Sequence, residues 1–142
     1  MIPNSAPKCL LVDDEEPMLQ MLSEYIEVLG FDPVVAHDGD EGIAAFRTFR
    51  PSLVVSDIHM PNRNGLLLLR DIKEMNPECP VILVTGLLLN YRSDLDSNPV
   101  QPDWLIEKPF GLSQLQIVIE QLKPAIEHAW SKLDNHGETS QT

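Results

Sequence analysis

Five polar residues stand directly or almost directly after short apolar runs: Asp13, Asp14, Asp57, Thr85 and Lys108. The runs are Cys9–Val12, Leu53–Ser56, Val81–Val84 and Leu105–Ile106. If these runs are neighbouring parallel strands, the five side chains gather at one edge of the sheet, where open α/β sheets build their sites. Carboxylates gathered at such an edge can act as nucleophiles and can bind a small hard cation such as Mg²⁺.

The segments around these residues alternate between strand and helix patterns. Strands are predicted at Lys8–Val12, Pro33–Ala36, Leu53–Ser56, Val81–Val84 and Trp104–Ile106. Helices are predicted at Pro17–Leu29, from an N-cap at Asp38 to about Phe49, at Leu66–Met75 and at Leu112–Leu122. This alternation predicts an α/β fold, a doubly wound five-stranded parallel sheet with right-handed crossovers and helices on both faces.

Two segments break this rhythm. A fourth helix is expected between Leu87 and Val100, yet Ser93–Pro102 is rich in Asp, Ser, Asn and Pro, so we expect an irregular helix that is short or absent. Pro124 should kink or break the last helix, and Pro124–Leu133 then predicts a short amphipathic helix. The apolar side of that helix is formed by Ile126, Ala129, Trp130 and Leu133. The ends, residues 1–7 and 134–142, are expected to be disordered.

Composition narrows the class of protein. The chain has 142 residues, 43% of them hydrophobic, which is enough for one core in one domain. Its formal net charge of -12 repels nucleic-acid phosphates and anionic lipids, so direct nucleic-acid binding is not expected. No apolar run approaches the roughly 18 residues of a membrane span, and we expect a cytoplasmic protein without membrane insertion. Cys9 and Cys79 fit neither a metal cluster nor a disulfide framework and are expected to be buried thiols.

Four short motifs follow one another in chain order: Val12-Asp13-Asp14-Glu15, then Asp57-Ile58-His59-Met60-Pro61 with Gly65 eight residues after Asp57, then Val84-Thr85-Gly86 and Lys108-Pro109-Phe110. Together they resemble the receiver domain of two-component response regulators over about residues 7–123. The resemblance implies a flavodoxin-like three-layer sandwich with strand order 2-1-3-4-5. It divides the chain into an N-terminal tail (1–7), a receiver domain (8–123) and a C-terminal part (124–142) with a short helix and a disordered tail.

The same resemblance assigns roles to the polar residues. Asp57 becomes the phosphoacceptor, and Asp14 and Asp57 become direct Mg²⁺ ligands. Asp13 would bind the metal through water, and the main-chain carbonyl of His59 would be a third protein contact. The His59 side chain itself is expected at the rim of the cleft, because no other His or Cys completes a zinc-type set. Lys108 would place a positive charge on one phosphoryl oxygen, and the hydroxyl of Thr85 would donate to another.

The expected function is a stand-alone receiver that accepts a phosphoryl group from a sensor histidine kinase or a phosphotransfer protein. It would act as a signalling domain of a bacterial two-component phosphorelay rather than as an enzyme, and would signal to a downstream protein target, with homodimer formation left open. Two alternatives remain, a receiver-like binding module that works without phosphorylation and an aspartyl-phosphate hydrolase. Such hydrolases typically carry a second Asp two residues after the nucleophile, where this chain has His59.

The residues also allow simpler interpretations, and the chain departs from the family pattern. Asp13 and Asp14 could merely cap the following helix, and Thr85 is an ordinary strand residue. The switch aromatic of the family normally lies three residues before the lysine, where this chain has Leu105. A signal is therefore expected to travel mainly through the segment Thr85–Asp103.

Overall fold

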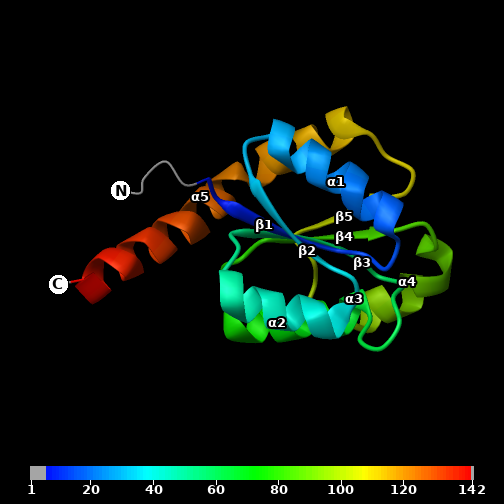
Figure 1. Ribbon diagram of the computed structural model, residues 1–142. Helices are drawn as coiled ribbons and strands as arrows, with labels where there is room; N and C mark the ends of the chain where they lie inside the picture. Colours follow the sequence, from blue (N-terminus) through cyan, green and yellow to red (C-terminus); the bar gives the residue numbers. More distant parts are fainter. Residues whose placement is uncertain (1–5, 142) are drawn as a thin grey trace.

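One sheet of five parallel strands forms the centre of the protein, in the order β2-β1-β3-β4-β5 (Figure 1). The structure, a computed structural model, describes residues 6–141, with side chains up to Leu133. The strands are β1 (Lys8–Val12), β2 (Asp32–Ala36), β3 (Leu53–Asp57), β4 (Val81–Thr85) and β5 (Trp104–Glu107). Every neighbouring pair is parallel, which confirms the predicted fold class and strand order.

Helices cover both faces of this sheet (Figure 1). They are α1 (Glu16–Val28), α2 (Gly39–Phe49), α3 (Gly65–Met75), α4 (Leu88–Ser97) and α5 (Leu112–Gln141). α1 and α5 pack on one face, and α2, α3 and α4 pack on the other. All residues of β3 and β4 are buried, as expected for parallel strands covered on both sides.

Polar side chains cap the first turns of two helices, α2 and α3. The Asp38 carboxylate accepts a hydrogen bond from the main-chain N–H of Glu41 at 2.8 Å, which confirms Asp38 as the N-cap of α2. Asn64 caps α3 in the same way, accepting from the N–H of Leu67 at 3.0 Å. Both caps satisfy donors that the first helical turn leaves free, and they fix where the two loops above the sheet end.

The fourth helix is longer than its composition predicts. We expected Ser93–Pro102 to be largely non-helical, but α4 continues to Ser97. The Ser97 hydroxyl donates to the carbonyls of Ser93 and Asp94, at 2.9 and 3.4 Å. Leu95 is buried against the core under α4, and this tertiary contact outweighs the weak helix propensity of the segment.

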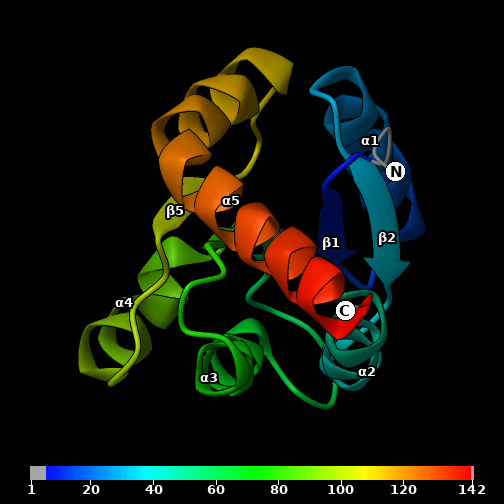
Figure 2. The same cartoon turned by 90° about the vertical axis from the view of Figure 1, so that its left-hand side faces the viewer.

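The last helix is also longer than predicted. Instead of a break at Pro124 and a disordered tail after Leu133, one helix runs from Leu112 to Gln141, and only Thr142 of that tail lies outside the described residues. Pro124 is exposed, so its missing N–H costs one bond without a clash against the core. Past the proline the helix crosses the amino-terminal end of the sheet (Figure 2). Ile126 and Ala129 are buried there.

Glu78, in the connection between α3 and β4, holds the far part of α5. Its carboxylate lies 3.0 Å from Nε2 of His128 and accepts from Nζ of Lys132 at 3.1 Å. Both partners lower the pKa of Glu78, Lys132 by the larger amount. Of the predicted tail at residues 1–7, residues 1–5 lie outside the described part of the chain. Pro7 is not disordered as predicted, because its carbonyl accepts from the N–H of Asp32 in β2 at 2.9 Å.

The two thiols are free and buried, as predicted. Burial raises the pKa of Cys79 to about 12 and raises that of Cys9 well above the usual range of a thiol. Both are therefore inert packing residues in the folded protein.

Candidate functional site

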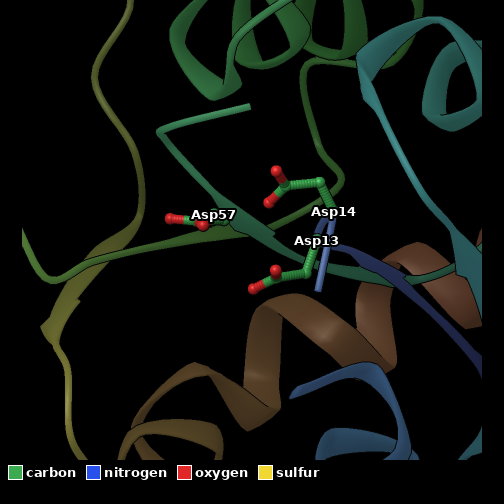
Figure 3. Close-up of side chains that lie close together, drawn as sticks. All are labelled: Asp13, Asp14 and Asp57. Carbon is green, nitrogen blue, oxygen red and sulfur yellow. The ribbon is translucent and has the colours of Figure 1, made fainter. Parts of the chain in front are cut away.

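Three aspartates meet at the carboxyl end of the sheet (Figure 3). Asp13 and Asp14 follow β1, and Asp57 is the last residue of β3. One carboxylate oxygen from each residue lies within 4.8 Å of the others. The sheet order produces this cluster because β1 and β3 are neighbours, although their ends are far apart in sequence. This juxtaposition is the one predicted from the apolar runs.

Lys108 supplies the positive charge of the cluster. Its Nζ donates to Asp13 at 3.1 Å and to Asp57 at 3.2 Å. The main chain positions it, because the N–H of Lys108 donates to the carbonyl of Thr85 at 2.9 Å and so ties the end of β5 to the end of β4. One cation therefore balances two buried carboxylates, while Asp14 is exposed.

Asp57 and Lys108 each shift the pKa of the other. Burial raises the pKa of Asp57, and the nearby Asp13 adds to this, while Lys108 opposes it without reversing it. For Lys108, burial disfavours the charged form, but Asp57 and Asp13 outweigh burial and raise its pKa. Lys108 is thus held as a cation, and the raised pKa of Asp57 comes mainly from its burial, which Lys108 only partly offsets.

The capping role that we considered for Asp13 is not found, because the N-cap of α1 is Glu15 and no side chain caps this helix. One carboxylate oxygen of Asp13 accepts from the N–H of Glu15 at 2.9 Å, in the turn before α1 begins. The other oxygen of the same carboxylate accepts from Lys108.

Gly65, at the start of α3, shows why the loop after Asp57 needs a glycine. A Cβ added at this position would lie 2.3 Å from the main-chain oxygen of Asp57. The N–H of Gly65 donates to the carbonyl of Ile58 at 2.9 Å. The spacing of eight residues between Asp57 and Gly65 therefore reflects a close approach of main chain to main chain.

Thr85 lies at the end of β4 with its side chain buried. Its hydroxyl oxygen accepts a hydrogen bond from the N–H of Leu87 at 2.9 Å. The structure therefore places Thr85 beside the cluster but engages its hydroxyl with the first turn of the next segment.

His59 lies at the rim of the cleft, as predicted for its side chain. Its N–H donates to Asp57 at 3.4 Å, a long hydrogen bond. Its ring nitrogen Nδ1 lies 2.6 Å from the hydroxyl of Tyr91 in α4. Sequence reasoning missed Tyr91, because 32 residues separate it from His59 and no local pattern links them.

An open cleft of about 280 Å³ lies over the cluster. It is lined by Asp14, Glu15, Asp57, His59, Gly86, Leu87 and Lys108. A larger hollow of about 390 Å³ lies between α1 and α5 and contains none of the cluster residues. The chemistry of the polar residues, rather than the size of the hollow, identifies the first cleft as the candidate site.

The fold agrees with a comparison with known proteins. The family model of the response regulator receiver domain matches residues 9–120, and the chain belongs to this family. The transcriptional regulatory protein RprY of Bacteroides fragilis is 30% identical over 115 residues, which cover 81% of this chain and 48% of RprY. The autoinducer 1 sensor kinase/phosphatase LuxN of Vibrio harveyi is 30% identical over 118 residues, which cover 83% of this chain and 14% of LuxN.

A solved structure shows the same likeness. The response regulator protein TrrA of Thermotoga maritima, in complex with Mg²⁺ and BeF, superposes with a TM-score of 0.73 at 30% identity. The match covers 82% of this chain and 98% of that one. The chain spans about half or less of the two curated relatives named above. Among the described residues, no helix combines the length and the apolar character needed to cross a membrane.

Proposed function

We propose that this receiver domain accepts a phosphoryl group on Asp57, from the phosphohistidine of a sensor histidine kinase or a phosphotransfer protein, with Mg²⁺ bound. The observation that carries the proposal is the cluster of three aspartates with Lys108 at the open end of the sheet. A structural ion pair alone would not need a third, exposed carboxylate facing the same cleft.

The donor set fits a hard divalent cation. Three carboxylate oxygens within 4.8 Å of one another match the oxygen ligands that Mg²⁺ takes in proteins. Asp14 and Asp57 would hold the ion directly, Asp13 through water, and the main-chain carbonyl of His59 would complete the protein contacts. When bound, the ion would neutralise the charge that gathers where two anions approach each other.

Asp57 would act as the nucleophile. One of its carboxylate oxygens forms a bond to phosphorus while the bond between phosphorus and the histidine nitrogen of the donor breaks, and the donor imidazole leaves with that electron pair. Lys108, already hydrogen-bonded to Asp57, would hold one phosphoryl oxygen. The hydroxyl of Thr85 would turn and donate its proton to another. These residues supply position and charge, which is the main contribution a protein makes to phosphoryl transfer.

The output would be a change in protein contacts. We infer a downstream protein target rather than nucleic acid, because the chain carries a net charge of -12. In this proposal the domain works as a signalling phosphoacceptor, and the phosphoryl group on Asp57 is its signal.

Labelling with acetyl phosphate and Mg²⁺, followed by intact mass measurement, tests the proposal. The wild type should gain one phosphoryl group, and Asp57→Asn should gain none. Asp96→Asn is the matched control, because Asp96 is an exposed aspartate of α4 outside the cluster, and it should be labelled like the wild type. Labelling of Asp57→Asn would exclude Asp57 as acceptor, and undiminished labelling in the presence of a chelator would exclude the metal. If the wild type gained no phosphoryl group, the binding-module alternative would replace the proposal.

A further inference from the structure

Tyr91 connects α4 to the candidate phosphoacceptor site. Its hydroxyl oxygen lies 2.6 Å from Nδ1 of His59, and the two rings lie 6.1 Å apart with an angle of 55° between them. The ring of Tyr91 is partly buried and packs on the core under α4 together with Leu88 and Leu105. Tyr91 therefore contacts both the rim of the site and the hydrophobic core beneath the helix.

The hydrogen bonds around Tyr91 form a chain from Asp57 to Thr85. The carboxylate of Asp57 accepts from the N–H of His59, and the ring of His59 bonds the hydroxyl of Tyr91. The N–H of Tyr91 donates to the carbonyl of Leu87 at 3.2 Å, and the N–H of Leu87 donates to the Thr85 hydroxyl. The first turn of α4 is thus tied to the site at two points, through His59 and through Thr85.

No residue of β5 offers a comparable polar contact. Leu105 is aliphatic and partly buried in the same core, so it has no hydrogen bond to exchange. The only other tyrosine of the chain, Tyr25, belongs to α1 and packs on the opposite face of the sheet. Tyr91 is therefore the one tyrosine on the α4 side of the sheet, and it contacts the rim of the site through His59.

We propose that Tyr91, through its hydrogen bond to His59, is a positioning residue that holds α4 in the arrangement of the unphosphorylated site. The inference rests on the proposed function. In this proposal the Thr85 side chain turns toward Asp57 to donate its proton to a phosphoryl oxygen, and the N–H of Leu87, which now donates to the Thr85 hydroxyl, follows or is released. Either change shifts the first turn of α4 relative to His59.

A bond that exists before this shift and breaks during it stabilises the starting arrangement. Removing the Tyr91 hydroxyl should therefore favour the phosphorylated arrangement and tighten binding of a phosphoryl mimic. One hydrogen bond between neutral groups supports an effect of roughly two- to tenfold in the dissociation constant. The same factor should appear in the reverse direction, as a mimic-induced change at α4, because coupling between two sites is reciprocal.

The probe is beryllofluoride with saturating Mg²⁺, and its affinity is measured by calorimetry and by fluorine NMR. Tyr91→Phe should bind it roughly two- to tenfold more tightly than the wild type. Tyr25→Phe, the matched control, should bind it like the wild type. His59→Leu removes the ring but keeps the main-chain carbonyl, and adding Tyr91→Phe to it should cause no further change.

Equal or weaker binding by Tyr91→Phe would overturn the inference, as would an effect that persists in full in the His59→Leu background. In the wild type, the imidazole nitrogen resonances of His59 should also move when beryllofluoride binds, and unmoved resonances would overturn it without any variant. These failures differ from a failure of the proposed function, in which the wild type itself would bind no beryllofluoride.

Discussion

Lys108 is the residue whose replacement tests the electrostatics of the site most directly. We expect Lys108→Met to destabilise the protein far more than Lys8→Met. Both lysines form an ion pair with an aspartate at 3.2 Å, Lys108 with Asp57 and Lys8 with Asp32. They differ in burial: the side chains are 16% and 8% exposed in the first pair, but 36% and 55% exposed in the second. The comparison therefore separates burial from charge and distance.

The expected loss of stability in Lys108→Met can be estimated from the charges that remain when the lysine is gone. Asp13 and Asp57 would face each other with no positive partner, and the least costly relief is to protonate one of them. For an aspartate with an ordinary pKa of about 3.9, protonation at pH 7 costs about 4 kcal/mol. This is an upper limit, because water in the open cleft also screens the charges, so we expect a loss of about 2–4 kcal/mol. Lys8→Met should cost about 0–1 kcal/mol, as exposed pairs do.

The stability lost in Lys108→Met should depend on pH, and the pKa of Asp57 determines in which direction. Burial and Asp13 already raise the pKa of Asp57, and losing Lys108 raises it further. The folded variant then binds a proton more tightly than the unfolded chain does. Its penalty is complete above the raised folded pKa and disappears as the pH falls below the ordinary range of aspartate.

Urea unfolding followed by circular dichroism, without metal, measures the loss at pH 7 and pH 5. The loss should be clearly smaller at pH 5, and added Mg²⁺ should restore part of it at pH 7. A loss that is equal at both pH values, or no larger than that of Lys8→Met, would refute this account of the site.

Three further outcomes are expected. Truncation after Lys123 should lower the free energy of unfolding by about 2–3 kcal/mol, because it exposes the sheet end that α5 covers, and an unchanged melting temperature would show the extension to be passive. The pKa of His37 should lie above its usual value, because Glu41 and, to a smaller extent, Glu16 bond its ring. NMR titration should show that this pKa falls in Glu41→Gln. The stability that His37 contributes is present at low pH and is lost as the pH rises through its folded pKa. Hydrogen exchange with beryllofluoride should change protection in residues 86–103 more than in residues 105–107, and the opposite pattern would contradict a signal through α4.

The ends of the strands were the most predictable part of the molecule. A polar residue after a buried apolar run marks the point where a parallel strand leaves the core, and this holds for Asp57 and Thr85. Parallel strands bring such ends together whatever lies between them in the sequence, so the cluster was predictable once the alternation was clear. The cap at Asp38 was equally local, since its partner Glu41 is three residues away.

The two helices that differed from prediction depend on distant contacts. Nothing near Ser93 indicates that Leu95 is buried by the core under α4, and nothing near Pro124 indicates that Glu78 binds the helix about 50 residues later. Propensity and proline were correctly read as unfavourable, but burial of a few side chains outweighed them. Helix propensity can be judged from a single sequence, whereas the stabilisation from contacts with distant residues cannot.

The same distinction explains the site. The charges of the cluster belong to the strand ends, whereas the contact between His59 and Tyr91 depends on where α4 packs. The role proposed for Tyr91 depends on the packing of α4, and the burial of Leu95 holds this helix against the core. Leu105 in β5 offers no side-chain hydrogen bond, whereas Tyr91 in the first turn of α4 bonds the ring of His59 and so provides a polar link between the site and this face of the protein.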